Sequence, residues 1–426
     1  MAATATNLTP PLMTKVLYTV LFTLLVVIHN PFSSTVFGVW GTPKLICLIT
    51  ICIANAIILF STEETIESHD IWLWIGWGGL LISGLVSTLT SPLPSISLLG
   101  VGANRDGLAY WCLVAIFCIT NRAVLTHQPS LLKWQLMGFL TGATMSSAAV
   151  LAQVIVPVDY TAYRLGGNEF QPMGLFSHRA YTAFISSLSL IGLNIAWCRH
   201  WGNRPALKLM ALITILALLV SNTRGAILAA VIGATWIGTR QPRPKRWIFI
   251  GLTVVALSTV LYTSSLRKVD VEQYTKSSLE LFARNLTSDR LHLWQRAYKS
   301  IPIRPLYGWG FNGLAIADAV KVCAPHRAVA LIEYQAVCSN EEQIYEDNYV
   351  NAKAHNIIVD DLISTGAVGL LAKCILLTIY ASIYRRSINS QAAILTYVTF
   401  LMLWFDHVQL THLAWWLVTV ADIDSS

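Results

Sequence analysis

The sequence predicts an all-α polytopic membrane protein, and its composition carries that prediction. Of its 426 residues, 55% are hydrophobic and only 12% are charged, whereas an ordinary soluble domain has about 25% charged residues. A membrane-spanning helix needs about 20 mostly apolar residues, so a chain of this length and composition has room for on the order of a dozen. The formal net charge of +7 fits basic cytoplasmic loops, and we therefore expect no nucleic-acid partner.

Apolar stretches without a sustained run of charge predict about twelve transmembrane helices. In chain order they fall at residues 16–29, 44–60, 71–89, 107–121, 131–153, 179–198, 205–220, 225–239, 247–264, 362–383, 391–405 and 408–421. The first is interpreted as a retained span, since no early basic region and no small-residue cleavage site precede it. Because several stretches are near the lower length limit for a span, the last two have a re-entrant pair as their alternative.

The distribution of Lys and Arg predicts a cytoplasmic N-terminus. In that orientation most basic residues of the short loops face the cytoplasm, as the positive-inside rule requires. The basic residues left on the opposite side are Lys44, Arg105, Arg164, Arg179 and Arg224. Residues 1–264 then hold nine spans, residues 265–354 form a large outer loop, and residues 355–426 hold the last three spans. A loop of that length without structure of its own is uncommon, so we expect short helices in it.

One amphipathic helix is expected in this loop. The segment Ser288–Ser300 places Leu291, Trp294 and Tyr298 on one helical face, behind a cap at Ser288 or Asp289. Trp294 and Tyr298 would suit the headgroup level, where such rings are enriched.

Two cysteines share the same loop. If the loop is extracytoplasmic, Cys323 and Cys338 can form a disulfide, and two free thiols are the alternative. No cysteine spacing typical of a metal site is present.

Four outer-side arginines form a candidate anion site: Arg105, Arg164, Arg179 and Arg224. Guanidinium groups bind phosphate bidentately, and more strongly where water is partly excluded. The alternative is that each reaches lipid phosphates or pairs with a local acid such as Asp106 or Glu169. A functional role is favoured for Arg224, since its connection is only about four residues long and Gly225 permits a sharp turn. His178 adjoins Arg179 and is a further candidate, with a structural hydrogen bond as its favoured alternative.

The second candidate group is the segment Ala354–Gly369, AHNIIVDDLISTGAVG. His355 stands at the outer end of a helix, where an imidazole can accept a proton from a hydroxyl group, and capping the helix is the alternative. Asp360 and Asp361 lie deeper, where ionised groups are costly and are usually functional or paired. Lys373, within the span, is expected to snorkel inward.

Three segments together resemble the O-antigen ligase and O-antigen polymerase superfamily, the bacterial WaaL and Wzy membrane glycosyltransferases. They are SNTRGAIL (residues 221–228), SDRLHLWQRAYKSIPIRPLYGWGFN (288–312) and HNIIVDDLISTGAVG (355–369). Their order and their placement around a long outer loop after nine spans favour this family, and the likeness runs from about residue 97 to 370.

This resemblance implies a GT-C-like helical glycosyltransferase in the bacterial inner membrane, with its active site on the periplasmic face and no metal or other cofactor. The implied donor is a glycan on undecaprenyl pyrophosphate, and the acceptor is a lipid A core for a ligase or a second lipid-linked glycan for a polymerase. By the same resemblance, Arg224 and Arg290 bind the pyrophosphate, and His355 activates the acceptor hydroxyl in an inverting displacement. The further candidates for substrate binding are Arg105, Arg164, Arg179, His178, Asn356, Asp289 and Trp294.

Two other classes of protein stay open from the sequence. A transporter or flippase of an anionic lipid-linked solute would typically show inverted repeats and a midplane site, whereas this chain has no evident repeat and gathers its arginines at one face. A non-catalytic scaffold would need no such set of arginine and histidine residues.

Overall fold

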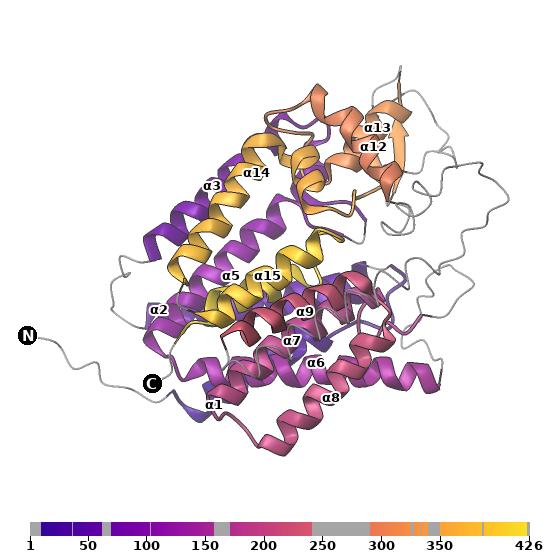
Figure 1. Ribbon diagram of the computed structural model, residues 1–426. Helices are drawn as coiled ribbons and strands as arrows, with labels where there is room; N and C mark the ends of the chain where they lie inside the picture. The colour runs from indigo at the N-terminus through magenta and orange to yellow at the C-terminus, as the bar shows by residue number, and fades with distance from the viewer. Residues whose placement is uncertain are drawn as a thin grey trace, which may run out of the picture.

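A computed structural model describes residues 10–35, 37–61, 70–102, 104–156, 171–240, 290–324, 328–332, 334–339, 350–385 and 387–423. This part of the chain is mostly helical, as the sequence predicts (Figure 1). In chain order the elements are α1 (Leu12–Val27), η1 (Phe37–Gly41), α2 (Thr42–Phe60), α3 (Asp70–Thr90), α4 (Pro94–Leu99), α5 (Leu108–His127), α6 (Leu131–Ile155), α7 (Arg179–Cys198), α8 (Arg204–Val220), α9 (Arg224–Thr239), α12 (Leu291–Ser300), η3 (Ile301–Ile303), α13 (Gly313–Val322), β1 (Ala328–Ile332), β2 (Gln335–Cys338), α14 (Ile357–Ile383), α15 (Ile388–Leu401) and α16 (Thr411–Val420).

Six helices in the described part of the chain are long and apolar enough to cross a membrane. They cover Phe37–Phe60, Ile71–Thr90, Leu108–His127, Leu131–Ile155, Arg179–Cys198 and Ile357–Ile383. Two shorter apolar helices, α1 and α9, have 16 residues each. The prediction of a polytopic helical membrane protein is therefore confirmed. The expected ninth span at 247–264 lies outside the described residues.

The last apolar run, at residues 408–421, is not a full span. Its helix α16 has ten residues, about 15 Å of helix, against a hydrocarbon core about 30 Å thick. Every residue of α16 is buried, and the helix packs against α5 and α15. Mean hydropathy alone does not separate a buried core helix from a span. A single helical span at 408–421 is therefore not supported, and the re-entrant pair expected as its alternative stays a prediction.

Helices α1 and α6 pack closely because two glycines remove side chains between them. A Cβ on Gly138 would lie 2.4 Å from the carbonyl oxygen of Thr19, and one on Gly142 would lie 2.8 Å from the Cβ of Val26. Thr23 Oγ1 donates across the same contact to the carbonyl oxygen of Gly138 (3.1 Å). Small residues four apart are a common means of close helix approach in membranes.

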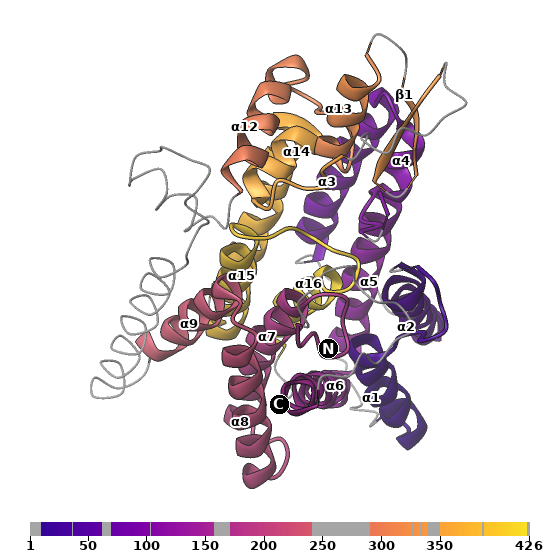
Figure 2. The same ribbon diagram turned by 90° about the vertical axis from the view of Figure 1, so that its right-hand side faces the viewer.

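At one end of the bundle, α12, α13 and the β1–β2 hairpin form a small layer over the start of α14 (Figure 2). We call this end the outer end. Helix α12 buries Leu293, Ala297 and Ser300, whereas Tyr298 is 59% exposed. The expected short helix is therefore confirmed, with Trp294 partly buried against the layer, and the placement of Trp294 and Tyr298 at the headgroup level stays a prediction. Ser288 and Asp289, the expected caps, lie outside the described residues, and Arg290 occupies the N-cap position without a capping side-chain bond.

The layer is closed by a disulfide and an ion pair. Cys323, directly after α13, is disulfide-bonded to Cys338 at the end of β2. Arg296 Nη2 lies 3.0 Å from Asp318 Oδ2, which joins α12 to α13.

Two of the segments that carry the family resemblance meet backbone to backbone. The Trp309 and Gly310 amides donate to the carbonyl oxygens of Ile363 (2.9 Å) and Ser364 (2.8 Å). Helix α14 is kinked close to these bonds, at Gly366, whose φ is +69°. A Cβ on this residue would lie 2.3 Å from the carbonyl oxygen of Leu306. Only glycine fits this conformation and this approach without strain, so the glycine at 366 fixes the outer layer onto α14.

Candidate functional site

The predicted site segments converge on residues 402–410, which connect α15 to α16 and which we call the 402–410 connection. From the turn before α5, the carbonyl oxygen of Asn104 accepts from the Val408 amide (3.4 Å). At the start of α7, Ser177 exchanges hydrogen bonds with Gln409 (3.2 and 2.7 Å). At the start of α9, a Cβ on Gly225 would lie 3.3 Å from the Cβ of Leu403.

Trp404 lies at the centre of this convergence. Its ring centroid is 5.0 Å from that of His355 and 5.1 Å from that of His178. The Arg290 guanidinium carbon lies 4.7 Å from the Trp404 ring centroid, within the range of a cation–π contact. We call Trp404, His355, His178 and Arg290 the Trp404 cluster. Three of its members are residues singled out from the sequence.

His355 is held in a special backbone conformation. Its φ of +60° lies in the left-handed region that few non-glycine residues adopt. Its Nδ1 lies 3.2 Å from the carbonyl oxygen of Lys353, which suits an Nδ1–H donor and leaves the Nε2 lone pair to accept a proton. The second ring beside it is that of Phe405, at 4.7 Å.

Burial, followed by the positive charge of Arg290, lowers the pKa of His355 to about 3. Burial and the charges of Arg179 and Arg290 likewise lower the pKa of His178 to about 4. Both imidazoles are therefore neutral at neutral pH. His178 also serves as the N-cap of α7, because its Nδ1 accepts from the Ala180 amide (3.1 Å).

Arg290 is anchored by the backbone of the 402–410 connection. Its Nη1 donates to the carbonyl oxygen of Leu403. Burial lowers its pKa to about 10, against the raising effect of Asp360, so the guanidinium stays charged at neutral pH.

Asn356 and Trp294 fix the backbone on either side of His355. The Asn356 side chain caps α14 by accepting from the amides of Ile358 (3.1 Å) and Val359 (3.2 Å), while its Nδ2 donates to the carbonyl oxygen of Met402 (3.0 Å). Trp294 Nε1 donates to the carbonyl oxygen of Ala354 (2.9 Å). Their described contacts are therefore structural.

The remaining candidates are placed less centrally or lie outside the described residues. Arg224 is the first residue of α9 after a three-residue turn from α8, and Arg179 is the first residue of α7. Arg105 stacks over Phe37, with 5.2 Å from its guanidinium carbon to the ring centroid. Arg164 and Asp289 lie outside the described residues.

A buried network of charged side chains lies next to the Trp404 cluster, since two of its members, Lys353 and Asp406, lie two residues from His355 and Trp404 in the chain. Lys353 forms an ion pair with Asp106, and Lys373 pairs with Asp361 (3.1 Å) and Asp406 (2.8 Å). Lys373 is only 3% exposed, so its side chain lies inside the bundle. Its ammonium group stays inside because two carboxylates compensate its charge there.

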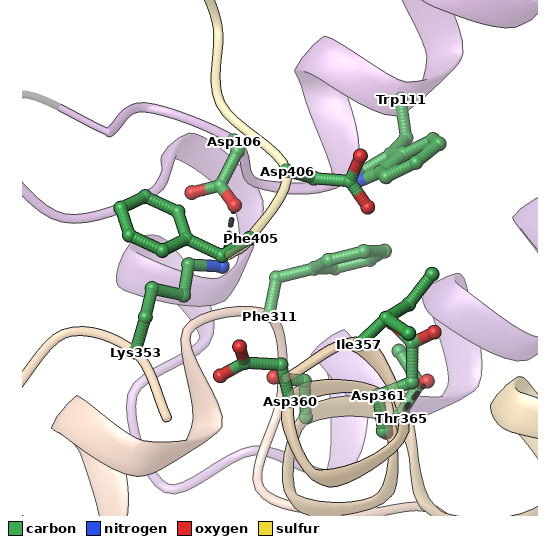
Figure 3. A pocket seen from close by; sticks show the side chains of 11 residues that line it. Asp106, Trp111, Phe311, Lys353, Ile357, Asp360, Asp361, Thr365, Phe405 and Asp406 are labelled. Atoms are coloured by element: carbon green, nitrogen blue, oxygen red, sulfur yellow. Dashed lines mark hydrogen bonds and ion pairs between the residues drawn. The ribbon is translucent and has the colours of Figure 1, made fainter. Parts of the chain in front are cut away.

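A pocket lies between α5, α14 and the 402–410 connection (Figure 3). The charged side chains that line it are Asp106, Lys353, Asp360, Asp361 and Asp406. Aromatic rings complete its wall, namely those of Trp111, Phe311 and Phe405. Burial lowers the pKa of Lys353, but the carboxylates of Asp106 and Asp360 outweigh that effect and raise it above its ordinary value. In the described part of the chain, no group of three or more His, Cys, Asp or Glu side chains is arranged to hold a metal ion.

Sequence reasoning missed Trp404, Leu403 and Asp406. Leu403 acts through its carbonyl oxygen, and an aromatic residue inside an apolar run is indistinguishable from a membrane-interface anchor. The signal for Asp406 was its position between two apolar runs. Burying an ionisable group within the membrane costs free energy, so such a residue is usually functional or paired.

Part of this chain matches a known protein family. Residues 209–374 match the family model described as O-antigen ligase. This range includes Arg224, Arg290 and His355, and the resemblance to the O-antigen ligase and polymerase superfamily is thereby confirmed.

Two curated proteins are similar over longer stretches. Over 332 residues the chain is 21% identical to the exopolysaccharide production protein ExoQ of Rhizobium meliloti (strain 1021), covering 74% of this chain and 66% of that protein. Over 244 residues it is 25% identical to the general O-oligosaccharyltransferase of Acinetobacter baylyi (strain ATCC 33305 / BD413 / ADP1), covering 52% of this chain and 39% of that protein. The chain thus spans less than two thirds of the length of either relative.

Proposed function

Because this multi-pass membrane protein carries an O-antigen ligase family domain over residues 209–374, we propose that it transfers a glycan from undecaprenyl pyrophosphate to an acceptor sugar hydroxyl. In the ligase form of the reaction the acceptor is a lipid A core. The reaction takes place at the periplasmic face of the bacterial inner membrane. It inverts the anomeric centre in a single displacement and needs no metal.

The observation that carries the proposal is the contact of Arg290 and His355 with the same Trp404 ring (4.7 and 5.0 Å). In one displacement reaction, a neutral imidazole can accept the proton of the attacking hydroxyl while a nearby cation stabilises the leaving group. The acceptor oxygen forms a bond to the anomeric carbon as its proton passes to His355 Nε2. The bond from the anomeric carbon to the phosphate oxygen breaks, and its electron pair leaves with the pyrophosphate.

Arg290 stabilises the charge that develops on the leaving pyrophosphate. Fixed cations aimed at developing charge are commonly the largest electrostatic contribution to catalysis. Arg224, the first residue of α9 and the neighbour of Gly225, which lies against Leu403, is the second cation in this role.

Substrate binding would also activate His355. In the free protein, burial and Arg290 hold its pKa at about 3, low for a general base at neutral pH. An anionic pyrophosphate beside Arg290 offsets that positive charge and favours the protonated imidazole. The base therefore gains strength when the donor is bound.

A polymerase is the second candidate, and the relation to ExoQ favours it. That protein is named for exopolysaccharide production, and its alignment covers more of this chain than that of the oligosaccharyltransferase. Both reactions need the same donor pocket and differ on the acceptor side, which residues 265–354 would shape.

The test is to incubate purified protein with a lipid-linked repeat unit, with and without lipid A core. We expect core-dependent product from a ligase. A ladder formed from donor alone assigns the polymerase instead. Absence of product in both incubations, with uptake of the lipid-linked glycan into proteoliposomes, would reject transfer in favour of transport.

A further inference from the structure

The five residues Met402–Asp406 carry contacts to every member of the Trp404 cluster. The carbonyl oxygens of Met402 and Leu403 accept from Asn356 and Arg290. The rings of Trp404 and Phe405 flank His355 (5.0 and 4.7 Å). The segment is irregular, since α15 ends at Leu401 and α16 begins at Thr411. The amides of Met402, Leu403 and Trp404 still donate to carbonyl oxygens at the end of α15 (2.9, 3.0 and 3.4 Å), so other contacts are needed mainly to place Phe405 and Asp406.

Asp406 makes such contacts at the C-terminal end of the segment. Its Oδ2 receives Lys373 Nζ (2.8 Å). Its Oδ1 receives the hydroxyls of Tyr397 (2.6 Å) and Thr411 (3.0 Å). Asp406 is 8% exposed and Lys373 is 3% exposed. The carboxylate is thus tied to α14, α15 and α16 at once.

We propose that the Lys373–Asp406 ion pair is a positioning device for the transfer reaction: it holds Met402–Asp406 where this segment orients His355 and Arg290. The inference rests on the proposed function for its catalytic meaning. Lys373 and Asp406 are positioning residues, because neither is described in contact with His355 or Arg290. They act through the segment and, for Lys373, also through Asp361 at the start of α14.

The partners of the neighbouring charges argue against a ligand site at the same place. Each carboxylate of the pocket has a partner. Asp106 pairs with Lys353 (Figure 3), and Asp361 pairs with Lys373, which lies outside the pocket lining. Asp360 accepts from the amides of Ala354 (2.7 Å) and Asn356 (3.3 Å). These charges compensate one another inside the bundle, although Asp106 Oδ1 and Asp361 Oδ2 accept no hydrogen bond from the described residues. A network of this kind, when satisfied, rigidifies the groups attached to it.

The decisive variant is Lys373→Met, which removes the charge and keeps an unbranched side chain. Arg122→Met is the matched control, because Arg122 forms an ion pair with Asp422 (2.8 Å) at the other end of α5 from Asp106. Tyr397→Phe is a milder second variant, since it removes only a hydroxyl that donates to Asp406. Lys373→Arg keeps the charge and should restore much of the wild-type behaviour.

The first readout does not depend on activity. The protein is labelled with 5-fluorotryptophan, and the ¹⁹F resonance of Trp404 is assigned among the 15 tryptophans by its absence in Trp404→Phe. We expect this resonance to move or broaden in Lys373→Met, less so in Tyr397→Phe, and not in Arg122→Met. An unchanged Trp404 resonance in folded Lys373→Met or Tyr397→Phe overturns the proposal.

The second readout is transfer kinetics. In Lys373→Met we expect kcat to fall about tenfold or more with little change in KM, because a misplacement of about 1 Å can cost about a hundredfold. In this variant His355 should become more exposed to water, which raises its pKa, so the acid limb of the pH profile should shift to higher pH. The charged and titratable groups that face His355 are Arg290, His178, Lys353 and Asp360. Arg122→Met should change neither.

The two proposals fail in different ways. If wild-type protein performs no transfer but the Trp404 resonance responds to Lys373→Met, the proposed function is rejected and the positioning role stands. If wild-type protein transfers and Lys373→Met keeps wild-type kcat and pH profile, the positioning role is rejected and the transferase stands.

Discussion

At the scale of single residues, Trp404 is the side chain that joins the proposed base to the proposed cation. Trp404→Ala removes the ring that both His355 and Arg290 contact. We expect it to lower kcat by about a hundredfold, as for other losses of positioning, while Trp404→Phe keeps a smaller aromatic face and lowers it less. Single-turnover transfer by the two variants measures this. Equal rates for alanine and phenylalanine would show that the ring has no such role.

The neutral histidines also predict how stability depends on pH. Because burial lowers the pKa of His355 to about 3 from an ordinary value of 6.5, the unfolded chain binds more protons than the folded one between these values. Stability should therefore fall as the pH is lowered below about 6.5. After allowance for partial exposure, the loss at pH 4.5 is about 1–2 kcal/mol from this residue.

Thermal unfolding in detergent at pH 7.0 and 4.5 measures this loss. His355→Gln should narrow the difference in Tm between the two pH values, whereas substitution of the exposed His200 should leave it unchanged. A difference as large in His355→Gln as in wild type would contradict the assignment.

At the scale of elements, the α1–α6 contact depends on its glycines. In Gly138→Ala the new Cβ meets the backbone oxygen of Thr19 at 2.4 Å, so the helices must separate. We expect a loss of about 1–3 kcal/mol, typical of overpacking. Gly79→Ala on α3 is the matched control, since a Cβ there meets nothing within 4 Å and alanine favours a helix by about 1 kcal/mol. Similar Tm values for the two variants would refute close packing at Gly138.

The elements also show what the sequence could and could not predict. Arg290 and His355 were recognisable because charged and polar residues stand out beside apolar spans and fall within segments of familiar pattern. The pairing of Lys373 with Asp406 was not, because the two lie 33 residues apart and a lone lysine in a span is usually interpreted as snorkelling. The length of α16 was missed since a buried core helix and a span have the same mean hydropathy.

At the scale of the whole molecule, the orientation in the membrane remains a prediction from the positive-inside rule. Tyr298, 59% exposed at the outer end, would face the periplasm, whereas the exposed Cys198 at the end of α7 would face the cytoplasm. In intact cells a membrane-impermeant maleimide should label Tyr298→Cys, and Cys198 only after permeabilisation. The reverse pattern would place the Trp404 cluster in the cytoplasm.

The central claim is that Arg224, Arg290 and His355 act together in glycan transfer, and its most direct measurement uses purified variants with a lipid-linked donor and acceptor. Arg224→Ala, Arg290→Ala and His355→Ala should each abolish transfer while the protein still inserts and keeps its Tm within a few degrees. Arg122→Met, altered away from the cluster, should transfer normally. Normal transfer by the three alanine variants would contradict the account.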